Sequence, residues 1–536
     1  MASISDDSKT VPYNRTRLFV ASCVALVTTA MTFAIRGDVL NDFGREFSLS
    51  NQLMGWITLV GIWGFPIAIL IGGPLCDYVG MGRLLRTASL GHVLGVILTI
   101  LSPIGGYPML LAATLVLGLS NGLVEAVINP LAATMYSDQK THKLNMLHAF
   151  WPAGLVIGGV LAMLISLGFG LGHGATDAIV SLSWKIKYGT ILISAILYYV
   201  LLIGQKFPST ERVQAGVSGG EMFREALRPG FIFLLFCMCL TAITELGPDG
   251  WIGAVMSKTV HMQTGGIIFL VYTSGFMFIL RFFAGPLVKR LTPAGLLACC
   301  AALSAIGLFW LSFSFTAGMA FLAATVFAFG KTFFWPTMLG VTSERYPRGG
   351  SLLLAMMGAV GNFAAGGAAP IMGQINDAHT LSSISSPAVR DSVVGKEGQF
   401  NVRAAVNLEA LAKKPDPVGE LNSVVAAIKA AEARGPVTIE TLPDNVKDYV
   451  KGGDGAYDPR FAATLEALAA KPNPAEDISA SAAALSEAEK QGAASSFRYV
   501  AVLPVVLVVL FGVMFIFFVT KGGYRPVHVS DETGTG

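Results

Sequence analysis

The stretch GLVEAVINPLAATMY, residues 122–136, places one acidic residue, Glu125, inside an otherwise apolar run. Part of this stretch, EAVINP (125–130), matches KTFFWP (331–336) at an offset of 206 residues. A second pair of similar stretches, GGPLCDYVG and AGPLVKRLT, places Pro74 and Pro286 212 residues apart. These matches predict a duplicated fold, in which the two halves of the chain are related to each other.

The composition is that of a membrane protein. Of the 536 residues, 53% are hydrophobic and 13% are charged, and the mean hydropathy is +0.62. Soluble globular chains average about 25% charged residues. The net charge of +3 is small and dispersed, which argues against nucleic acid as a partner. We therefore predict an all-α polytopic protein that lies in a lipid bilayer.

Runs of about 20 apolar residues cross a bilayer as helices, because lipid offers the backbone no other hydrogen-bond partners. Twelve such runs are present, six on each side of a polar linker, and they predict two pseudo-symmetric bundles of six helices. The predicted units are a tail at 1–16, an N-terminal bundle at 17–205, the linker at 206–229, helices 7–11 at 230–378, an insert at 379–497, helix 12 at 498–521 and a tail at 522–536.

Lysine and arginine in short loops stay on the cytoplasmic side of a membrane. Sixteen of them fall on the side of the termini and the linker, and five fall on the other side; Arg281 is counted among the sixteen. We therefore expect a multi-pass monomer in the cell membrane (the inner membrane if the source is bacterial), with both termini cytoplasmic and the insert outside.

The predicted insert is rich in Ala, Glu, Lys, Pro and Ser and carries a repeat of its own. LEALAKKPDP begins at Leu408, and LEALAAKPNP begins at Leu465. Runs of Ala, Glu, Lys and Leu that end in proline are typical of short helices with abrupt stops. The insert is either a small helical cap or a partly disordered segment.

The loop GGPLCDYVGMGRLL follows the second predicted span. Glycine permits a tight turn there, and Asp77 can cap or bridge a neighbouring helix end, with Arg83 as its charge partner. Breaking such a contact would release one bundle from the other, so the loop is predicted to be a conformational latch. The predicted latch residues are Gly73, Asp77, Gly80 and Arg83.

This loop resembles the signature loop of the major facilitator superfamily, lengthened by Met81 and Gly82. Within that superfamily the chain is similar to the fucose permease group of sugar–proton symporters, and the similarity extends over most of 17–378. The stretches that carry it are RGDVLNDFGREFSLSNQLMG, NGLVEAVINP, LNMLHAFWPAG, FFWPTMLGVTSERY and MMGAVGNFAAGGAAPIMGQINDA. The resemblance implies transport by alternating access, with Glu125 in the position of the proton-coupling carboxylate and Asp38 in that of a key aspartate. The group carries small amide side chains where this chain has His148 and Trp151.

Glu125 has two interpretations. A carboxyl group that is neutral when dry and ionised when wet can carry a proton, and a buried carboxyl group can also bridge helices. The offset of 206 residues makes Lys331 the counterpart of Glu125, so we expect a Glu125–Lys331 pair across a central cavity; the alternative for Lys331 is a side chain that reaches a helix end. Asp38, beside Arg36, is either a gate carboxylate or a solvated residue at the mouth.

Further polar and aromatic residues in the apolar runs are candidates for substrate contacts. His148 could bind, relay protons or serve as a core histidine, and Glu245, with Asp249 one turn later, could line a cavity. Tryptophans suit stacking on a sugar or base as well as core packing, and asparagines suit hydroxylated ligands as well as helix bridging. The predicted substrate-binding residues are His148, Trp151, Asn129, Glu245, Lys331, Trp335 and Asn362.

The sequence contains no recognisable nucleophile–base pair, metal cluster or phosphate loop, so we predict neither an enzyme nor a bound cofactor or metal. The leading prediction is a secondary transporter that imports a small polar solute, such as a sugar or nucleoside, together with protons. Proton-driven efflux of amphipathic compounds is the alternative within transport. A sensor that binds a partner through the insert is the alternative outside transport.

Overall fold

The computed structural model describes residues 13–47, 49, 51–170, 176–260, 265–314, 316–394, 400–450 and 457–527. Within these ranges the chain is helical, apart from turns, coil and an isolated antiparallel bridge between Val394 and Phe400. Nine helical stretches of the described chain are long and apolar enough to cross a membrane. One of them, Leu53–Met135, is 83 residues long and turns back on itself, so the stretches are fewer than the predicted spans.

The N-terminal half folds into long apolar helices at each predicted span. The third and fourth spans lie in one element, α3, which is interrupted at Gly106; its φ of 69° favours glycine. The helices are α1 (Arg15–Glu46), α2 (Asn51–Leu75), the short π-helix η1 (Cys76–Gly80), α3 (Met81–Met135), α4 (Lys140–His148), α5 (Phe150–Gly168) and α6 (Asp177–Leu202).

The C-terminal half repeats this pattern, and its tenth predicted span is broken. One helix ends at Lys331 and the next begins at Phe334, where Pro336 cannot donate a backbone hydrogen bond. The helices are α9 (Pro229–Val260), α10 (Gly265–Arg281), α11 (Ala284–Leu311), α12 (Ala317–Lys331), α13 (Phe334–Arg345), α14 (Gly350–Ser383) and α21 (Val502–Thr520).

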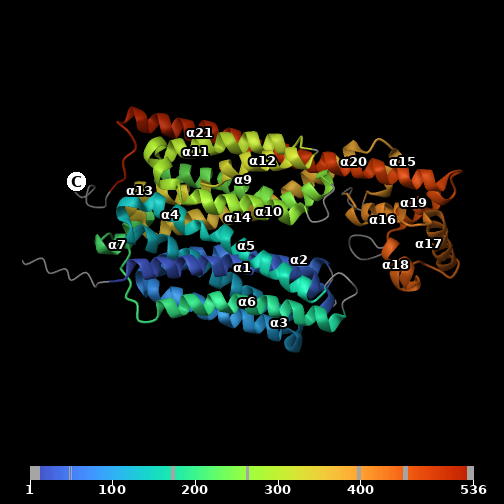
Figure 1. Cartoon of the computed structure of the whole chain (residues 1–536), viewed down its shortest axis with the longest axis horizontal. Helices are drawn as coiled ribbons and strands as arrows, with labels where there is room; N and C mark the ends of the chain where they lie inside the picture. The colour runs from blue at the N-terminus through green and yellow to red at the C-terminus, as the bar shows by residue number, and fades with distance from the viewer. Residues whose placement is uncertain are drawn as a thin grey trace, which may run out of the picture.

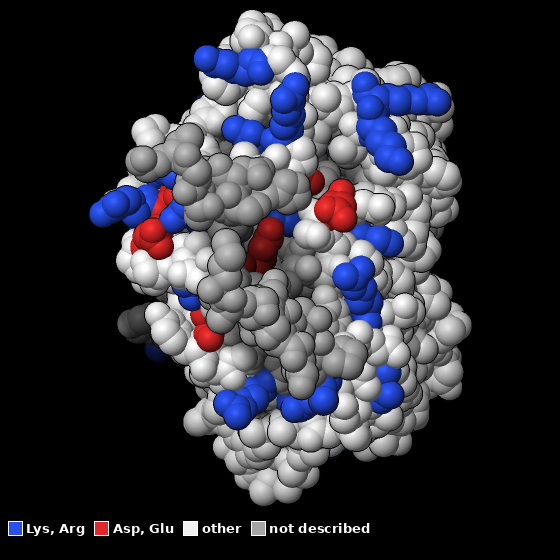
Figure 2. Space-filling model, turned by 90° about the vertical axis from the view of Figure 1, so that its left-hand side faces the viewer, with Lys and Arg blue, Asp and Glu red and all other residues white. Residues whose placement is uncertain are grey.

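The two halves lie side by side as two layers of roughly parallel helices (Figure 1). Helices α1, α3 and α6 lie in the lower part of this view, α4 lies beside α13 of the other half, and α21 lies on the opposite face of the molecule. α1 begins and α21 ends at the same end of the bundle, where the linker helices α7 (Glu211–Gln214) and α8 (Gly219–Glu225) are found. We call this the linker end. Lys and Arg side chains are spread around its rim (Figure 2).

At the linker end the two halves are closed against each other, chiefly through α4 and α13. Lys140 Nζ donates to the carbonyl of Ser343 over 3.2 Å, and the amide of Thr141 donates to the Glu344 carboxylate over 3.0 Å. Gly340 of α13 has no room for a Cβ because Thr141 packs directly on it. The two halves are therefore in direct contact at the linker end in the conformation seen here.

The described residues of the insert are helical and form a hydrophobic core of their own. Its buried apolar side chains lie between Leu381 and Ala488 and form a cluster separate from those of the bundle. The insert helices are α15 (Pro387–Ser392), α16 (Val402–Ala412), α17 (Pro417–Glu432), α18 (Asp444–Val450), α19 (Pro459–Ala469) and α20 (Pro474–Val500).

The repeat seen in the insert sequence is a repeated helical hairpin. α16 and α19 are its two copies, and their N-cap residues meet, since Asn401 Nδ2 donates to Asp458 over 2.7 Å. The prolines act as helix starts: Pro417 and Pro474 occupy the first helical positions of α17 and α20, where a missing N–H costs nothing. The predicted short helices with abrupt stops are therefore present.

α20 connects the insert to the bundle, because it leads directly into α21. The C-terminal part of α20 packs on α14 so closely that Gly492 has no room for a Cβ beside Thr380 and the carbonyl of Asn376. Ser496 Oγ also donates to the carbonyl of Met372 over 3.3 Å. The insert thus stands on a two-helix stalk made by the C-terminal half.

Deleting residues 385–490 should leave a folded bundle. The deletion removes nearly all of the insert core, while the stalk contact at Thr380 and Gly492 remains and brings the two chain ends together. We expect the purified variant to elute as a single species in detergent and to melt cooperatively, as judged by circular dichroism. Aggregation of the variant, with loss of cooperative melting, would show that the insert is needed for the bundle to fold.

The predicted latch loop differs from expectation in its charge partner. Asp77, whose side chain is 1% exposed, pairs with Arg212 of the linker at 2.7 Å and accepts a hydrogen bond from Thr210. Arg83 is exposed and lies 3.5 Å from the carbonyl of Val79, so its predicted pairing with Asp77 is wrong. The sequence loop alone could not show that the linker folds back onto it.

The glycines of the loop have two different roles. Gly80 has a φ of 92°, as a tight turn requires. Gly73 lies inside α2 rather than in the turn, and Ala355 and the carbonyl of Ser351 from α14 pack directly on its Cα. The prediction that Gly73 forms the turn is therefore wrong; this residue lets the two halves approach closely.

Replacing Arg212 should be far more damaging than replacing Arg83. Arg212→Ala leaves the buried Asp77 carboxylate without its cation, which should lower the free energy of unfolding by about 3–5 kcal/mol. Arg83→Ala removes an exposed side chain and should change it by less than about 0.5 kcal/mol. Thermal and denaturant unfolding of the two purified variants in detergent compares them directly. Equal losses in both variants would contradict the assignment of Arg212 as the partner.

Candidate functional site

A small cavity of about 40 Å³ lies between the two halves. Its walls come from both of them, so neither half forms the site alone. Six of the residues predicted from sequence line it. The lining residues are Phe65, Glu125, His148, Trp151, Glu245, Leu246, Arg281, Trp335 and Asn362.

On the side of the N-terminal half, a chain of hydrogen bonds begins at Glu125. Asn129, one turn further along α3, donates through Nδ2 to Glu125 Oε2 over 2.7 Å. Its Oδ1 lies 2.9 Å from Nε2 of His148, at the end of α4. All three residues are at most 5% exposed. An amide held between a carboxyl group and an imidazole fixes the orientation of both, and the cavity lies beside them.

On the side of the C-terminal half, the cavity is lined by an ion pair. Glu245 of α9 and Arg281 of α10 are 3.0 Å apart, and their side chains are 5% and 2% exposed. Glu245 Oε1 takes part in this pair, whereas Oε2 is buried and has no hydrogen-bond partner among the described residues. Glu245 therefore has a free acceptor atom next to the cavity.

Lys331 does not pair with Glu125. Its ammonium group, which is fully buried, forms a salt bridge with Asp249, which follows Glu245 by one turn on α9. The predicted Glu125–Lys331 pair is therefore wrong, and Lys331 is not among the residues that line the cavity. The internal repeat places Glu125 and Lys331 at equivalent positions of the two halves. The acidic partner of Lys331, Asp249, lies on α9 outside the repeated stretches, so the repeat could not predict this pair.

The predicted place of Arg281 in a cytoplasmic loop is wrong. The residue is 1% exposed and lines the cavity. The signal was present in FMFILRFFAG (276–285), where one cation interrupts an apolar run in the same way that Glu125 interrupts its own. A single cation inside an apolar run is expected to pair with a buried acid.

Aromatic side chains form further walls of the cavity. The rings of Trp151 and Phe65 stack with centroids 6.5 Å apart and an interplanar angle of 24°, and Phe33 packs against both. Trp335 is 8% exposed on the other half. Asn362 of α14 also lines the cavity, and its Nδ2 donates to the carbonyl of Gly358 over 2.8 Å.

Asp38 lies apart from this cavity. It forms a salt bridge of 2.5 Å with Lys187 of α6, whose side chain is 2% exposed, and Asp42 lies 3.9 Å from the same ammonium. Arg36, its neighbour in sequence, stacks on the ring of Phe33 at 4.8 Å. Asp38 is thus joined to α6 near the end of the bundle opposite the linker, and no described contact connects it to Glu125.

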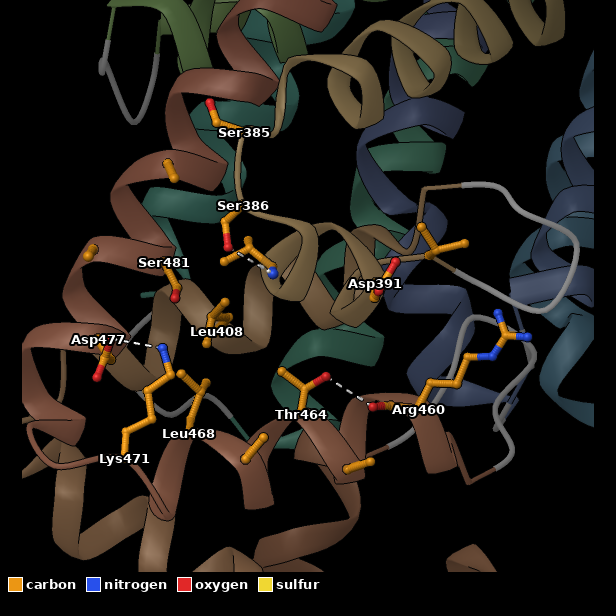
Figure 3. Close-up of a pocket in the computed structure, with 16 residues that line it drawn as sticks. Ser385, Ser386, Asp391, Leu408, Arg460, Thr464, Leu468, Lys471, Asp477 and Ser481 are labelled. Atoms are coloured by element: carbon orange, nitrogen blue, oxygen red, sulfur yellow. Dashed lines mark hydrogen bonds and ion pairs between the residues drawn. The ribbon is translucent and has the colours of Figure 1, made fainter.

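A larger hollow of about 820 Å³ lies in the insert, between α15, α19 and α20 (Figure 3). Its floor contains Leu408 and Leu468, and Lys471 and Asp477 form an ion pair of 3.0 Å at its edge. Among the described residues of the whole chain, no group of three or more His, Cys, Asp or Glu side chains is arranged to hold a metal ion.

The chain is similar in sequence to two curated transporters over part of its length. It is 26% identical over 186 residues to facilitated glucose transporter protein 1 of Caenorhabditis elegans, a match that covers 34% of each chain. It is 25% identical over 251 residues to the MFS-type transporter ppz2 of Metarhizium majus, covering 46% of this chain and 40% of that one. The matches thus span less than half the length of these relatives.

Solved structures share the fold at low identity. The Escherichia coli fucose:proton symporter FucP superposes with a TM-score of 0.57 at 19% identity, over 67% of this chain and 92% of that one. The E. coli proton:xylose symporter XylE gives 0.55 at 14% identity, over 67% and 88%. A sequence model of the Major Facilitator Superfamily matches residues 18–370. Since this match covers more than half of the sequence, the chain belongs to the Major Facilitator Superfamily.

Proposed function

We propose that this protein carries a small hydroxylated solute, such as a sugar, across the cell membrane together with protons. The two halves rock about the central cavity and open it alternately to the two sides. In this proposal twelve helices span the bilayer, the linker end faces the cytoplasm and the insert lies outside. The basic rim of the linker end supports this orientation, because cytoplasmic loops carry an excess of lysine and arginine (Figure 2).

The observation that carries the proposal is the buried carboxyl group of Glu125 beside a cavity closed by both halves. Asn129, itself bonded to His148, holds this group by a hydrogen bond and forms no ion pair with it. A carboxyl group in such a place is neutral when the cavity is dry and can ionise when water enters. Alternating access supplies water from one side and then from the other, so Glu125 can take up a proton on one side and release it on the other.

The polar groups of the cavity favour a ligand with hydroxyl groups. Glu245 Oε2 can accept a hydrogen bond, and Trp151 and Trp335 offer flat apolar faces of the kind that pack on sugar rings. FucP and XylE are described as sugar:proton symporters, and one curated relative as a facilitated glucose transporter.

Uptake into proteoliposomes tests the proposal. The purified protein is reconstituted into vesicles with an alkaline lumen, and labelled hexoses, pentoses, polyols and nucleosides are offered outside one at a time. We expect one class to accumulate above its external concentration, and a protonophore to abolish that accumulation. If no member accumulates, the proposal is wrong; if a preloaded member instead leaves against its gradient, the direction is export.

A further inference from the structure

Arg281 makes three hydrogen bonds that connect three different segments around the cavity. Its Nη2 donates to Glu245 over 3.0 Å, its Nε donates to the carbonyl of Thr332 over 2.7 Å, and its Nη1 donates to the carbonyl of His148 over 2.6 Å. The first two partners belong to its own half. The third belongs to the N-terminal half, so this bond crosses between the halves.

A helical carbonyl normally accepts from the amide four residues later, so a carbonyl that is free to bind Arg281 needs an explanation. The residue four positions after His148 is Pro152, which has no N–H and cannot donate. The helix is also interrupted here, with α4 ending at His148 and α5 beginning at Phe150. Pro152 therefore leaves the carbonyl of His148 available to Arg281.

The second carbonyl is free for the same reason. The residue four positions after Thr332 is Pro336, and the helix is again interrupted between α12 and α13. Two prolines, one in each half, thus expose two carbonyls that both point to one guanidinium. Hydrogen bonds from a charged donor are stronger than neutral ones, and the apolar surroundings strengthen them further.

The bond to His148 is also the last of a series. From the linker end towards the cavity, α4 is joined to the C-terminal half by Thr141 with Glu344, by Asn145 with Thr337 over 3.2 Å, and finally by His148 with Arg281. Only the last of these contacts involves a residue that lines the cavity as well. These contacts must separate if the halves rock open at the linker end.

We propose that Arg281 is a positioning residue that joins the two halves on the linker side of the cavity through its hydrogen bond to the carbonyl of His148. Pro152 makes this bond possible because it leaves that carbonyl without a helical donor. The inference rests on the alternating access proposed above, but not on the identity of the solute or on proton coupling. Breaking the hydrogen bond between Arg281 and His148 should favour the conformation in which the linker end is open.

The test uses Pro152→Ala in the full-length protein. Alanine supplies the missing N–H, so the carbonyl of His148 turns into the helix and its bond with Arg281 weakens, while every side chain of the cavity is retained. Spin labels at Arg83→Cys and Arg290→Cys, which are exposed residues of the two halves, report the separation of the linker end. Of the native cysteines, Cys239 and Cys299 are not buried and are replaced by serine.

In reconstituted protein without solute, we expect the fraction of molecules with a long label-to-label distance to rise about tenfold over the unsubstituted background, as loss of a hydrogen bond to a charged group implies. Pro336→Ala is the matched control. It restores a helical N–H in the same way but affects a bond that lies within one half, so the fraction should stay within about twofold.

Arg281→Lys provides the second variant, since lysine keeps the charge but cannot reach three acceptors at once. It should raise the long-distance fraction too, and adding Pro152→Ala to it should have no further effect, because both act on the same bond. An unchanged distance distribution in Pro152→Ala would overturn the proposal. So would an equal shift in Pro336→Ala, or full additivity of Pro152→Ala and Arg281→Lys. These distances are independent of transport, so failure of the proposed function would show separately.

Discussion

Glu125→Gln should abolish proton-driven accumulation while leaving exchange of solute across the membrane intact. Glutamine keeps the shape of the side chain and can still bond to Asn129, but it cannot gain or lose a proton. Exchange of internal for external solute needs no net movement of protons, so it should continue at a rate within a few-fold of the unsubstituted protein. Accumulation requires Glu125 to release its proton on the far side. In the variant, the internal solute concentration should therefore rise only to the external concentration.

The matched control is Glu46→Gln. Glu46 lies at the end of α1, where Trp184 donates to it over 3.4 Å, and it does not line the cavity. This variant makes the same chemical change in the same half and should accumulate solute normally. Unimpaired accumulation in Glu125→Gln would reject the coupling role, and loss of both accumulation and exchange would assign Glu125 to solute binding instead.

Lys331→Met should destabilise the protein severely, and a second substitution should restore it. The single change leaves the Asp249 carboxylate, which is 16% exposed, without its cation, and loss of one partner of a fully buried pair costs about 3–5 kcal/mol as an upper limit. Lys331→Met combined with Asp249→Asn removes both charges and should recover most of that loss, because no unpaired charge remains. Thermal unfolding in detergent measures both variants.

The order of stabilities distinguishes this pair from a Glu125–Lys331 pair. If Lys331 served Glu125, then Asp249→Asn would not rescue Lys331→Met, whereas Glu125→Gln would. We expect the reverse, because the structure joins Lys331 to Asp249 and gives Glu125 hydrogen bonds only to Asn129 among the described side chains. Rescue by Glu125→Gln alone would contradict the pairing.

The fold could be predicted from sequence because lipid imposes one simple rule on the backbone. Apolar runs coincide with the long helices of the bundle, and the short repeat around Pro130 and Pro336 predicts the duplication. Hydropathy did not predict how helices join: α3 turns at Gly106 within one long apolar stretch, and α20 leads from the insert into α21. Such connections depend on single backbone angles and on packing, which leave little trace in composition.

The candidate site could be predicted only as a set of residues. Polar side chains in apolar runs are costly, so Glu125, His148 and Glu245 stand out individually. The partners of these residues cannot be recognised in the sequence, because they come from other helices. Arg281 meets Glu245 only because α9 and α10 pack together, and Asp77 meets Arg212 only because the linker folds back. Asn129 lies beside Glu125 because four residues make about one helical turn, but the sequence predicts it only as a substrate-binding residue.

The most direct test of proton-coupled transport is to measure protons and solute in the same vesicles. Proteoliposomes that contain a pH-sensitive dye, with no gradient imposed, receive the solute identified by the uptake panel. Solute entry should then acidify the lumen in the unsubstituted protein and in Glu46→Gln, and should leave the lumen pH unchanged in Glu125→Gln, although solute still equilibrates. Solute entry without acidification in the unsubstituted protein, or undiminished acidification in Glu125→Gln, would contradict the account.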